Sequence, residues 1–229
     1  MVYNYPDVDD KNFYANIRNG DWNDGGLEDK YFNECFSQLP KPNRKKVLDA
    51  GCGLGKHIPK LTSIFKKVIA IDPDANRLEK TKEKFQNTSP FLEFKNTAIE
   101  NFNTIDKFDC IVCSQILQHV HLDAADTILN KFYTILKQKG FLILLTTNCL
   151  KAEDELLVVN CLTNAHIPVS RNAYNQHVNA NDIHLPTHLF TETSLRKLLD
   201  KAGFEIIFIK KFNGFPKIKG DNFIFARRL

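Results

Sequence analysis

The feature that most constrains this chain is the glycine-rich segment Asp49-Ala-Gly-Cys-Gly-Leu-Gly-Lys56, which follows a short apolar run. Gly51, Gly53 and Gly55 stand at alternate positions, so the backbone can turn tightly and a ligand can approach it without meeting a side chain. Residues 58–65 then carry apolar side chains at helical spacing. The segment predicts a strand, a turn with a ligand against it, and a helix; a tight turn without a ligand is the alternative.

Short apolar runs recur along the chain and are bounded by turn residues, which is typical of strands buried on both faces of a sheet. They occupy residues 47–48, 68–71, 91–94, 108–112, 141–145, 204–209 and 222–226. Helical spacing between most of these runs implies right-handed βαβ units and an open, mostly parallel sheet with helices on both faces. Only a turn-like stretch separates the last two runs, so a hairpin is expected there and one of those two strands is antiparallel.

Helix boundaries can be predicted from the residues that flank the apolar spacing. Residues 125–136 keep that spacing, with Asp123 as a cap and Gly140 as the stop. Thr191 is expected to cap a second helix that carries Leu195 and Leu199 and ends at Gly203.

The chain is expected to form one domain of 229 residues. Residues 41–147 and 191–229 form its predicted cofactor-binding core. Residues 148–190 are an insertion, expected on the substrate side because long insertions at the carboxyl ends of parallel strands tend to build or cover the ligand site. Residues 1–40 are a predicted cap segment with one amphipathic helix, and its early aromatic residues form a lid over the acceptor or only pack on the sheet: Tyr3, Tyr5, Phe13, Tyr14 and Trp22.

Composition excludes several classes of protein. With 43% hydrophobic and 25% charged residues, the chain has the balance of an ordinary globular protein. It has no run of about 18 apolar residues and no apolar block near its N-terminus, so we expect no membrane span and a cytoplasmic location. The six cysteines are expected to be reduced thiols. The net charge of +4 is mild and no nucleic-acid motif accompanies it, which argues against nucleic acid as a partner.

The glycine segment departs from the dinucleotide-binding fingerprint, because Lys56 stands where the third glycine of that fingerprint belongs. Its D-x-G-x-G-x-G pattern instead resembles motif I of class I S-adenosylmethionine-dependent methyltransferases. Asp72 ends the second predicted strand, where a carboxylate can accept hydrogen bonds from both ribose hydroxyls; a helix-capping role is the alternative, but Asp74 is better placed for it. The resemblance implies these cofactor-binding residues around the first two strands: Asp49, Gly51, Cys52, Gly53, Gly55, His57, Asp72 and Pro73.

Two later segments extend the resemblance over about residues 47–208. Residues 96–102 resemble the segment that lies along the adenine edge, and Ser114-Gln-Ile-Leu-Gln-His-Val120 resembles the "LxHV" version of motif IV in small-molecule methyltransferases of the ubiquinone- and menaquinone-biosynthesis type. The family implies a seven-stranded sheet of order 3-2-1-4-5-7-6 with strand 7 antiparallel. It also implies further cofactor contacts at Ala98, Ile99, Glu100, Ser114, Gln115 and Gln118.

A hydroxyl or ammonium acceptor must lose a proton when it is methylated, and histidine has a pKa suited to this task. His119 of the LxHV segment and His184 and His188 of the insertion are the candidate bases, although His119 could equally be a packed structural residue. A metal site at Asp182, His184 and His188 is not expected, because Pro186 opposes a helical histidine pair and Mg²⁺ prefers carboxylates and water.

The resemblance implies an enzyme that moves a methyl group from S-adenosylmethionine to a small molecule by in-line displacement and releases S-adenosylhomocysteine. Oxygen is the expected acceptor atom, ahead of nitrogen and carbon. An RNA or protein methyltransferase is one alternative, and a non-catalytic scaffold subunit that binds S-adenosylmethionine is another. The chain is expected to be a monomer or a homodimer.

Overall fold

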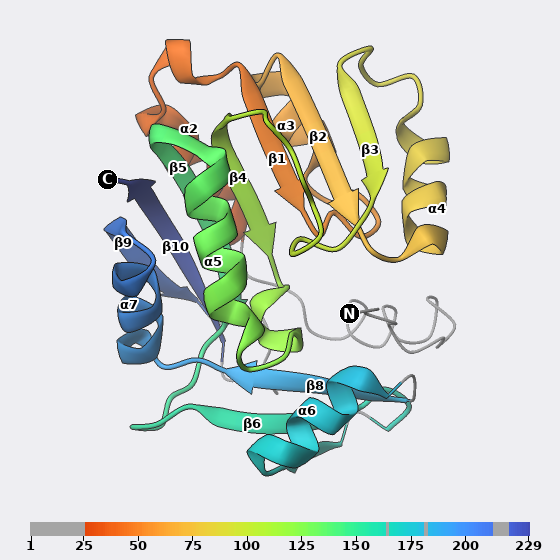
Figure 1. Ribbon diagram of the computed structural model, residues 1–229, viewed down its shortest axis with the longest axis vertical. Helices are drawn as coiled ribbons and strands as arrows, with labels where there is room; N and C mark the ends of the chain where they lie inside the picture. The colour runs from red at the N-terminus through yellow and green to blue at the C-terminus, as the bar shows by residue number, and fades with distance from the viewer. Residues whose placement is uncertain (1–25, 164, 181–182, 213–219) are drawn as a thin grey trace.

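The computed structural model describes residues 26–163, 165–180, 183–212 and 220–229. Its central sheet has the strand order β3-β2-β1-β4-β5-β10-β9 (Figure 1). β10 runs antiparallel to both β5 and β9, and the other neighbouring pairs are parallel. This confirms the predicted order and the antiparallel last strand. The strands are β1 Lys46–Ala50, β2 Lys67–Asp72, β3 Leu92–Asn96, β4 Phe108–Ser114, β5 Leu136–Thr147, β9 Phe204–Phe212 and β10 Asp221–Arg228.

Helices cover both faces of this sheet, as predicted. α5 and α7 lie in front of it in the view of Figure 1, and α2 and α3 lie behind it. The front core packs Phe132 of α5 against the sheet, and the back core packs Phe32 of α2 against Phe223 of β10. The helices are α2 Leu27–Gln38, α3 Ile58–Ile64, α4 Ala75–Phe85, α5 Ala124–Ile135 and α7 Glu192–Lys201, with short 3-10 turns η1 Lys41–Asn43 and η2 Leu117–His119.

Most of the predicted helix boundaries are confirmed. Asp74 caps α4 by accepting a hydrogen bond from the Arg77 N–H at 3.0 Å, and Thr191 caps α7 through the Ser194 N–H at 3.2 Å. Asp123 is the N-cap residue of α5, as predicted, but its side chain makes no capping hydrogen bond.

The predicted end of α5 is wrong. The helix stops at Ile135, and β5 begins at once with Leu136, which pairs with Phe108 of β4. Leu136 continues the helical spacing, but it is fully buried as a member of the sheet. A register irregularity follows before Phe141 pairs with Cys110, so Gly140 lies within a strand and does not end the helix.

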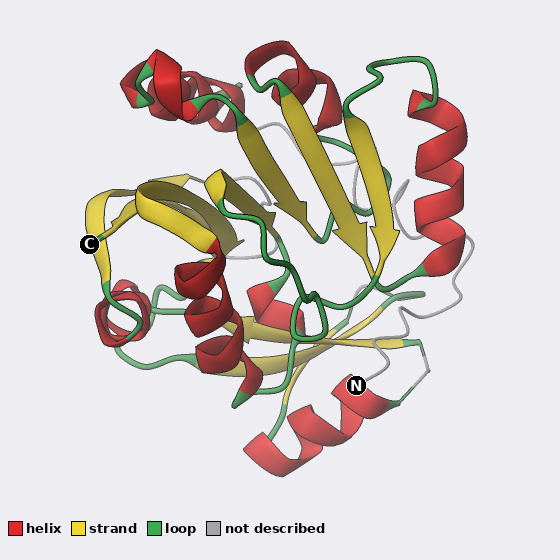
Figure 2. Cartoon of the chain, turned by 45° about the horizontal axis from the view of Figure 1, so that its top comes forward, coloured by secondary structure: helices red, strands yellow, loops and turns green. Residues whose placement is uncertain are grey.

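The insertion forms structure that its sequence does not predict. A second, three-stranded antiparallel sheet has the order β7-β6-β8, and the helix α6 packs against it. Figures 1 and 2 show this small sheet lying beyond the carboxyl ends of the parallel strands. Tyr174 of α6 ties it to the core, because its single hydroxyl proton is shared between the carbonyl oxygens of Gln118 and Val120 at 2.7 and 3.0 Å. The elements are β6 Glu155–Asn160, β7 His166–Pro168, α6 Arg171–Asn179 and β8 His184–Leu189.

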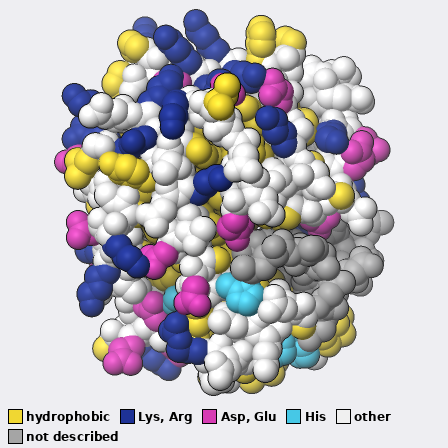
Figure 3. Space-filling view, in the orientation of Figure 1, with side chains coloured by type: hydrophobic (Ala, Val, Ile, Leu, Met, Phe, Trp, Pro, Cys, Tyr) yellow, Lys and Arg dark blue, Asp and Glu magenta, His cyan; other side chains and the backbone are white. Residues whose placement is uncertain are grey.

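None of the helices in the described part of the chain has the length and apolarity that crossing a membrane requires. All six cysteines are buried, and none of them forms a disulfide bond. Lysine and arginine side chains gather toward the top of the face in Figure 3, at the end of the central sheet away from the small sheet.

Candidate functional site

The three glycines of the turn after β1 serve different purposes. A Cβ at Gly55 would lie 2.5 Å from the Phe85 ring and 2.9 Å from Thr81, so Gly55 lets the turn pack tightly on α4. Gly53 has a φ of +50° and open space where its Cβ would be. Only Gly53 leaves the room beside its own Cα that a ligand against the turn needs; the sequence interpretation had treated the three glycines alike.

Gly51 brings the turn against the segment after β4. Its φ is +81°, and a Cβ there would lie 2.4 Å from the Cδ1 atom of Ile116. The neighbouring Gln115 has a φ of +58°, a left-handed conformation that costs a non-glycine residue of order 1–3 kcal/mol. The contact between these two turns therefore depends on strained backbone at Gln115 and on the missing side chain at Gly51.

Asp72 joins the glycine turn to the end of β2. Its Oδ2 accepts a hydrogen bond from the Gly53 N–H at 2.8 Å, and its Oδ1 accepts one from the Asp74 N–H at 2.9 Å. Burial raises the pKa of Asp72, and these two hydrogen bonds act in the opposite direction. Each carboxylate oxygen keeps a second lone pair that can accept a hydrogen bond from a ligand hydroxyl group.

Asp49, at the end of β1, is a buried carboxyl group. It is 1% exposed, and no group in the described residues hydrogen-bonds to its Oδ2. Burial raises its pKa to about 7, and the negative charge of Asp72 adds to the shift. A buried carboxylate without a partner is costly, so a positively charged ligand group placed beside Asp49 would stabilise its ionised form.

A pocket lies beyond the carboxyl ends of the central strands. One side of it, here called the glycine-turn wall, consists of Gly51, Pro73, Ala98, Ile99 and Glu100. The other side, the histidine wall, consists of His119, His177, His184 and Pro186. The apolar side chains between them are Ile116, Val120, Ile128, Val178, Ala180 and Leu185.

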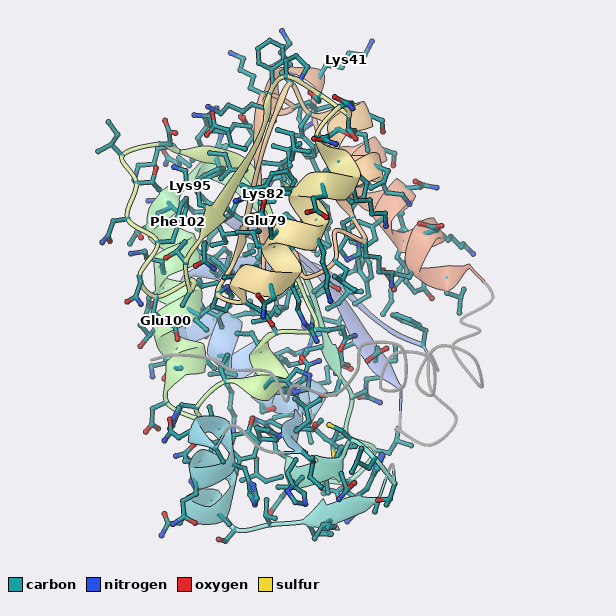
Figure 4. The ribbon with its side chains drawn as sticks, turned by 90° about the vertical axis from the view of Figure 1, so that its right-hand side faces the viewer. Lys41, Glu79, Lys82, Lys95, Glu100 and Phe102 are labelled. Carbon is teal, nitrogen blue, oxygen red and sulfur yellow. The ribbon has the colours of Figure 1, made fainter. Side chains whose placement is uncertain are left out.

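The pocket thus brings together seven of the residues predicted from sequence. In Figure 4, Glu100 lies on the side of the central sheet that faces the small sheet, whereas Lys41 lies at the opposite end. Between them, Phe102 carries the ammonium group of Lys95 over its ring at 5.6 Å. The predicted residues on the pocket are Gly51, Pro73, Ala98, Ile99, Glu100, His119 and His184.

The other predicted cofactor residues surround the turn without lining this pocket: Asp49, Cys52, Gly53, Gly55, His57, Asp72, Ser114, Gln115 and Gln118. Gln118 is used internally, because its Oε1 accepts from Thr146 Oγ1 at 3.0 Å and its Nε2 donates to Gln115 Oε1. The His57 ring packs on Phe32 of α2 at 4.8 Å between centroids, and burial lowers its pKa to about 3. For Gln118 and His57 the structure thus records contacts within the protein, and their cofactor roles stay predictions.

His119 projects from η2 with a fixed ring orientation. Its Nδ1 lies 2.7 Å from the carbonyl oxygen of Pro186, and a carbonyl oxygen can only accept, so Nδ1 carries the proton. Nε2 therefore has a free lone pair in the neutral ring. Burial lowers the pKa of His119 to about 4, although the hydrogen bond to Pro186 acts in the opposite direction. The ring is neutral at physiological pH.

The second histidine on this wall, His184, has a neighbour that the sequence interpretation missed. The ring centroid of His177 in α6 lies 5.3 Å from that of His184 in β8. The only signal for His177 was the richness of the insertion in histidine and asparagine, which does not single out a position.

His188 does not line the pocket. Its Nε2 lies 2.8 Å from Oδ2 of Asp154, and its ring centroid lies 3.8 Å from that of Phe190. Burial would raise the pKa of Asp154, but hydrogen bonds from His188, Thr191 and Ser194 lower it to about 2. Asp154 is a functional candidate that the sequence interpretation missed, because nothing in its sequence neighbourhood indicates that it meets His188.

No group of three or more histidine, cysteine, aspartate or glutamate side chains with the geometry of a metal site occurs in the described ranges. Asp182, which the sequence interpretation considered beside His184 and His188, lies outside those ranges. The aromatic residues proposed as a lid, from Tyr3 to Trp22, also lie outside them.

A family profile described as a methyltransferase domain matches residues 27–208 of the chain. The chain is also 24% identical over 103 residues to the ubiquinone biosynthesis O-methyltransferase of Rhodopseudomonas palustris (strain BisA53). That match covers 45% of this chain and 40% of the relative, so the chain spans about two fifths of the length of the curated relatives it matches.

Solved structures share the fold at low sequence identity. The 1,6-didemethyltoxoflavin-N1-methyltransferase of Burkholderia thailandensis, solved with 1,6-didemethyltoxoflavin and S-adenosylhomocysteine, superimposes with a TM-score of 0.64 at 19% identity, over 85% of this chain and 76% of that one. A S-adenosylmethionine-dependent methyltransferase from Clostridium acetobutylicum ATCC 824 gives a TM-score of 0.65 at 15% identity, over 94% and 96%.

Proposed function

The chain belongs to the methyltransferase domain family, and from this premise we propose that it transfers a methyl group from S-adenosylmethionine to a small-molecule acceptor. The observation that carries the proposal is the pocket, because it joins the glycine-turn wall to the histidine wall. The glycine-turn wall offers an apolar surface for a nucleobase, and Asp72 and Asp49 lie next to it at the ends of β2 and β1. The histidine wall offers ring nitrogens that can accept a proton from a second ligand.

The residues present fit S-adenosylmethionine. Asp72 would hold the ribose hydroxyls, and the buried side chains of Ala98 and Ile99 would face the adenine ring. Asp49, buried and without a partner for its Oδ2 in the described residues, would hold the positively charged amino group of the methionine tail. When bound, the cofactor supplies a methyl carbon activated by a positively charged sulfur. The protein's work is mostly to align that carbon with the acceptor and to exclude water.

His119 is the proposed general base, and oxygen is the proposed acceptor atom. The Nδ1–H group of His119 donates to the carbonyl oxygen of Pro186, so Nε2 is the atom that accepts the hydroxyl proton. A base whose pKa is about 4 binds that proton weakly and passes it on to solvent, so we assign His119 the task of orienting the hydroxyl as well as removing its proton. His177 and His184 would bind other polar groups of the acceptor.

The insertion, residues 148–190, is the proposed acceptor-binding part of the same domain, beside the core formed by residues 41–147 and 191–229. It contributes β8 and α6, and with them His177, His184 and Pro186, to the pocket. A small-molecule acceptor also agrees with the name of the matched Rhodopseudomonas relative.

The experiment that tests cofactor binding is a calorimetric titration of S-adenosylmethionine and S-adenosylhomocysteine into the protein. We expect binding of both, and we expect Asp72→Ala to weaken it at least tenfold because two hydroxyl partners are lost. Asp106→Ala is the matched control, since Asp106 is an exposed carboxylate paired with Lys46 and should leave affinity unchanged. A wild-type protein that binds neither compound would overturn the proposal.

A further inference from the structure

From the contacts of β8 we infer that His188 and Asp154 are positioning residues for His119, acting through the carbonyl group of Pro186. The inference rests on the proposed function, in which His119 accepts the proton. The sequence suggested that His188 itself was a base, but its ring is hydrogen-bonded to Asp154 outside the pocket. Its place in β8 gives it a different task.

β8 is an edge strand of the small sheet, and its outward carbonyl groups face the core. The Cys161 N–H donates to the Ile183 carbonyl at 2.8 Å, which fixes the alternation of the antiparallel ladder. Counting from Ile183, residues 184, 186 and 188 direct their N–H and C=O groups away from β6. A proline is tolerated at such a position because no ladder hydrogen bond is lost there.

Two of these outward carbonyls have partners in the core. The Pro186 oxygen accepts from His119 Nδ1 at 2.7 Å, and the His188 oxygen accepts from Thr147 Oγ1 of β5 at 2.6 Å. The two positions are about 6.6 Å apart along a strand. Any displacement of β8 at His188 is therefore transmitted to the carbonyl group that orients His119.

Asp154 fixes the His188 side chain to a rigid part of the core. Its Oδ1 accepts hydrogen bonds at the start of α7 from the Thr191 N–H at 2.7 Å, from Thr191 Oγ1 at 2.8 Å and from Ser194 Oγ at 2.7 Å. Its Oδ2 is left for His188 Nε2 at 2.8 Å. A carboxylate held by so many donors cannot follow a moving partner, so it defines where His188, and hence β8, must lie.

The consequence is a path from α7 through the Asp154–His188 hydrogen bond, along the backbone of β8 to Pro186, and on to His119. It selects the His119 ring form with the proton on Nδ1, which is the form that offers a lone pair to the acceptor. Without it, the ring would be free to rotate or to place its proton on Nε2, where it could no longer accept the hydroxyl proton.

The test compares His188→Leu, which removes the donor to Asp154, with His188→Gln, whose amide N–H can replace it. Nitrogen NMR of histidine-labelled protein reads the proton position on the His119 ring without requiring activity, so this readout stays informative even if methyl transfer is never found. The His119 signal is assigned with His119→Gln. We expect His188→Leu to lose the single Nδ1–H form and, where turnover is measured, to lower kcat at least tenfold with unchanged affinity for S-adenosylhomocysteine. His188→Gln should restore both.

His121→Leu is the matched control, because His121 also bonds a residue of the insertion, Asn179 at 2.8 Å, but does not contact β8 through that bond. It should leave the His119 signal unchanged. If His188→Leu does not fold, Asp154→Ala decides, since alanine removes the acceptor of the His188 Nε2–H group. A His119 ring that keeps its Nδ1–H form in the folded His188→Leu or Asp154→Ala variant would overturn the inference.

Discussion

The two walls of the pocket are held in place by different kinds of contact. The glycine-turn wall is built by backbone: Gly51 and Cys52 donate to the Ile71 carbonyl at 2.9 and 3.0 Å, and Gly53 donates to Asp72. The histidine wall is built by side chains from η2, α6 and β8 that meet across the insertion. The glycine-turn wall, held by backbone contacts, suits a cofactor that never changes. The histidine wall, held by side chains, can be altered residue by residue to take a new acceptor.

The largest effect is expected on the free energy of unfolding, at the most crowded position of the glycine-turn wall. Gly51→Ala places a Cβ 2.4 Å from Ile116 and forces alanine to a φ of +81°, so it should destabilise the fold by about 3 kcal/mol. Gly26→Ala is the control, because Gly26 has a φ of +77° with open space and should cost only about 1 kcal/mol. Urea unfolding measures both. Equal losses in the two variants would show that the Ile116 contact is not part of the wall.

The next largest effect is expected on the turnover rate, at His119 of the histidine wall. His119→Gln should lower kcat about 100-fold, the usual contribution of a positioned base, while affinity for S-adenosylhomocysteine stays unchanged. Because the pKa of His119 is about 4, the wild-type rate should not fall between pH 7.5 and 5.5, where an ordinary histidine would become protonated. Stopped-point assays over that range decide. A midpoint near 6.5 would mean that the base is another group.

Asp49→Asn separates stability from cofactor binding at the buried carboxyl group beside the glycine-turn wall. Burial raises the pKa of Asp49 to about 7, so between pH 3.8 and 7 the folded protein holds a proton that the unfolded chain has lost, and wild-type stability falls as pH rises through that window. The stability of the asparagine variant should not fall in this pH window, because its amide does not titrate. Relative to wild type, it should therefore gain stability between pH 5 and pH 8, and it should bind S-adenosylmethionine less tightly. An unchanged difference in stability between pH 5 and pH 8 would refute the assignment.

The smallest effect is expected at the far end of the histidine wall. His184→Phe keeps a ring of similar shape and removes the nitrogens, so it should raise KM for a polar acceptor several-fold and leave cofactor affinity unchanged. His166→Phe, also in the small sheet but not on the pocket, is the control. A change in cofactor affinity in the His184 variant would show that the two walls do not divide the ligands as proposed.

The difference between the walls also explains what could be predicted from the sequence. Gly51, Gly53 and Asp72 are readable because a turn with positive φ and a carboxylate at a strand end depend on local sequence. The strand order followed from the family resemblance that those residues carry. His177 and the Asp154–His188 pair depend on how the insertion folds back onto the core, and no local spacing encodes contacts between residues 34 positions apart. Leu136 is a second example: its spacing predicts a helical residue, but its pairing with Phe108, far away in the sequence, places it in a strand.

The most direct test of the central claim is methyl transfer itself. The protein is incubated with S-adenosylmethionine labelled in its methyl group and with the small-molecule and macromolecular fractions of a cell extract, separately, and the label is followed by mass. We predict label in a low-mass product, with His119→Gln reducing it about 100-fold. Label found only in RNA or protein, or no transfer to either fraction by a protein that binds the cofactor, would contradict the account.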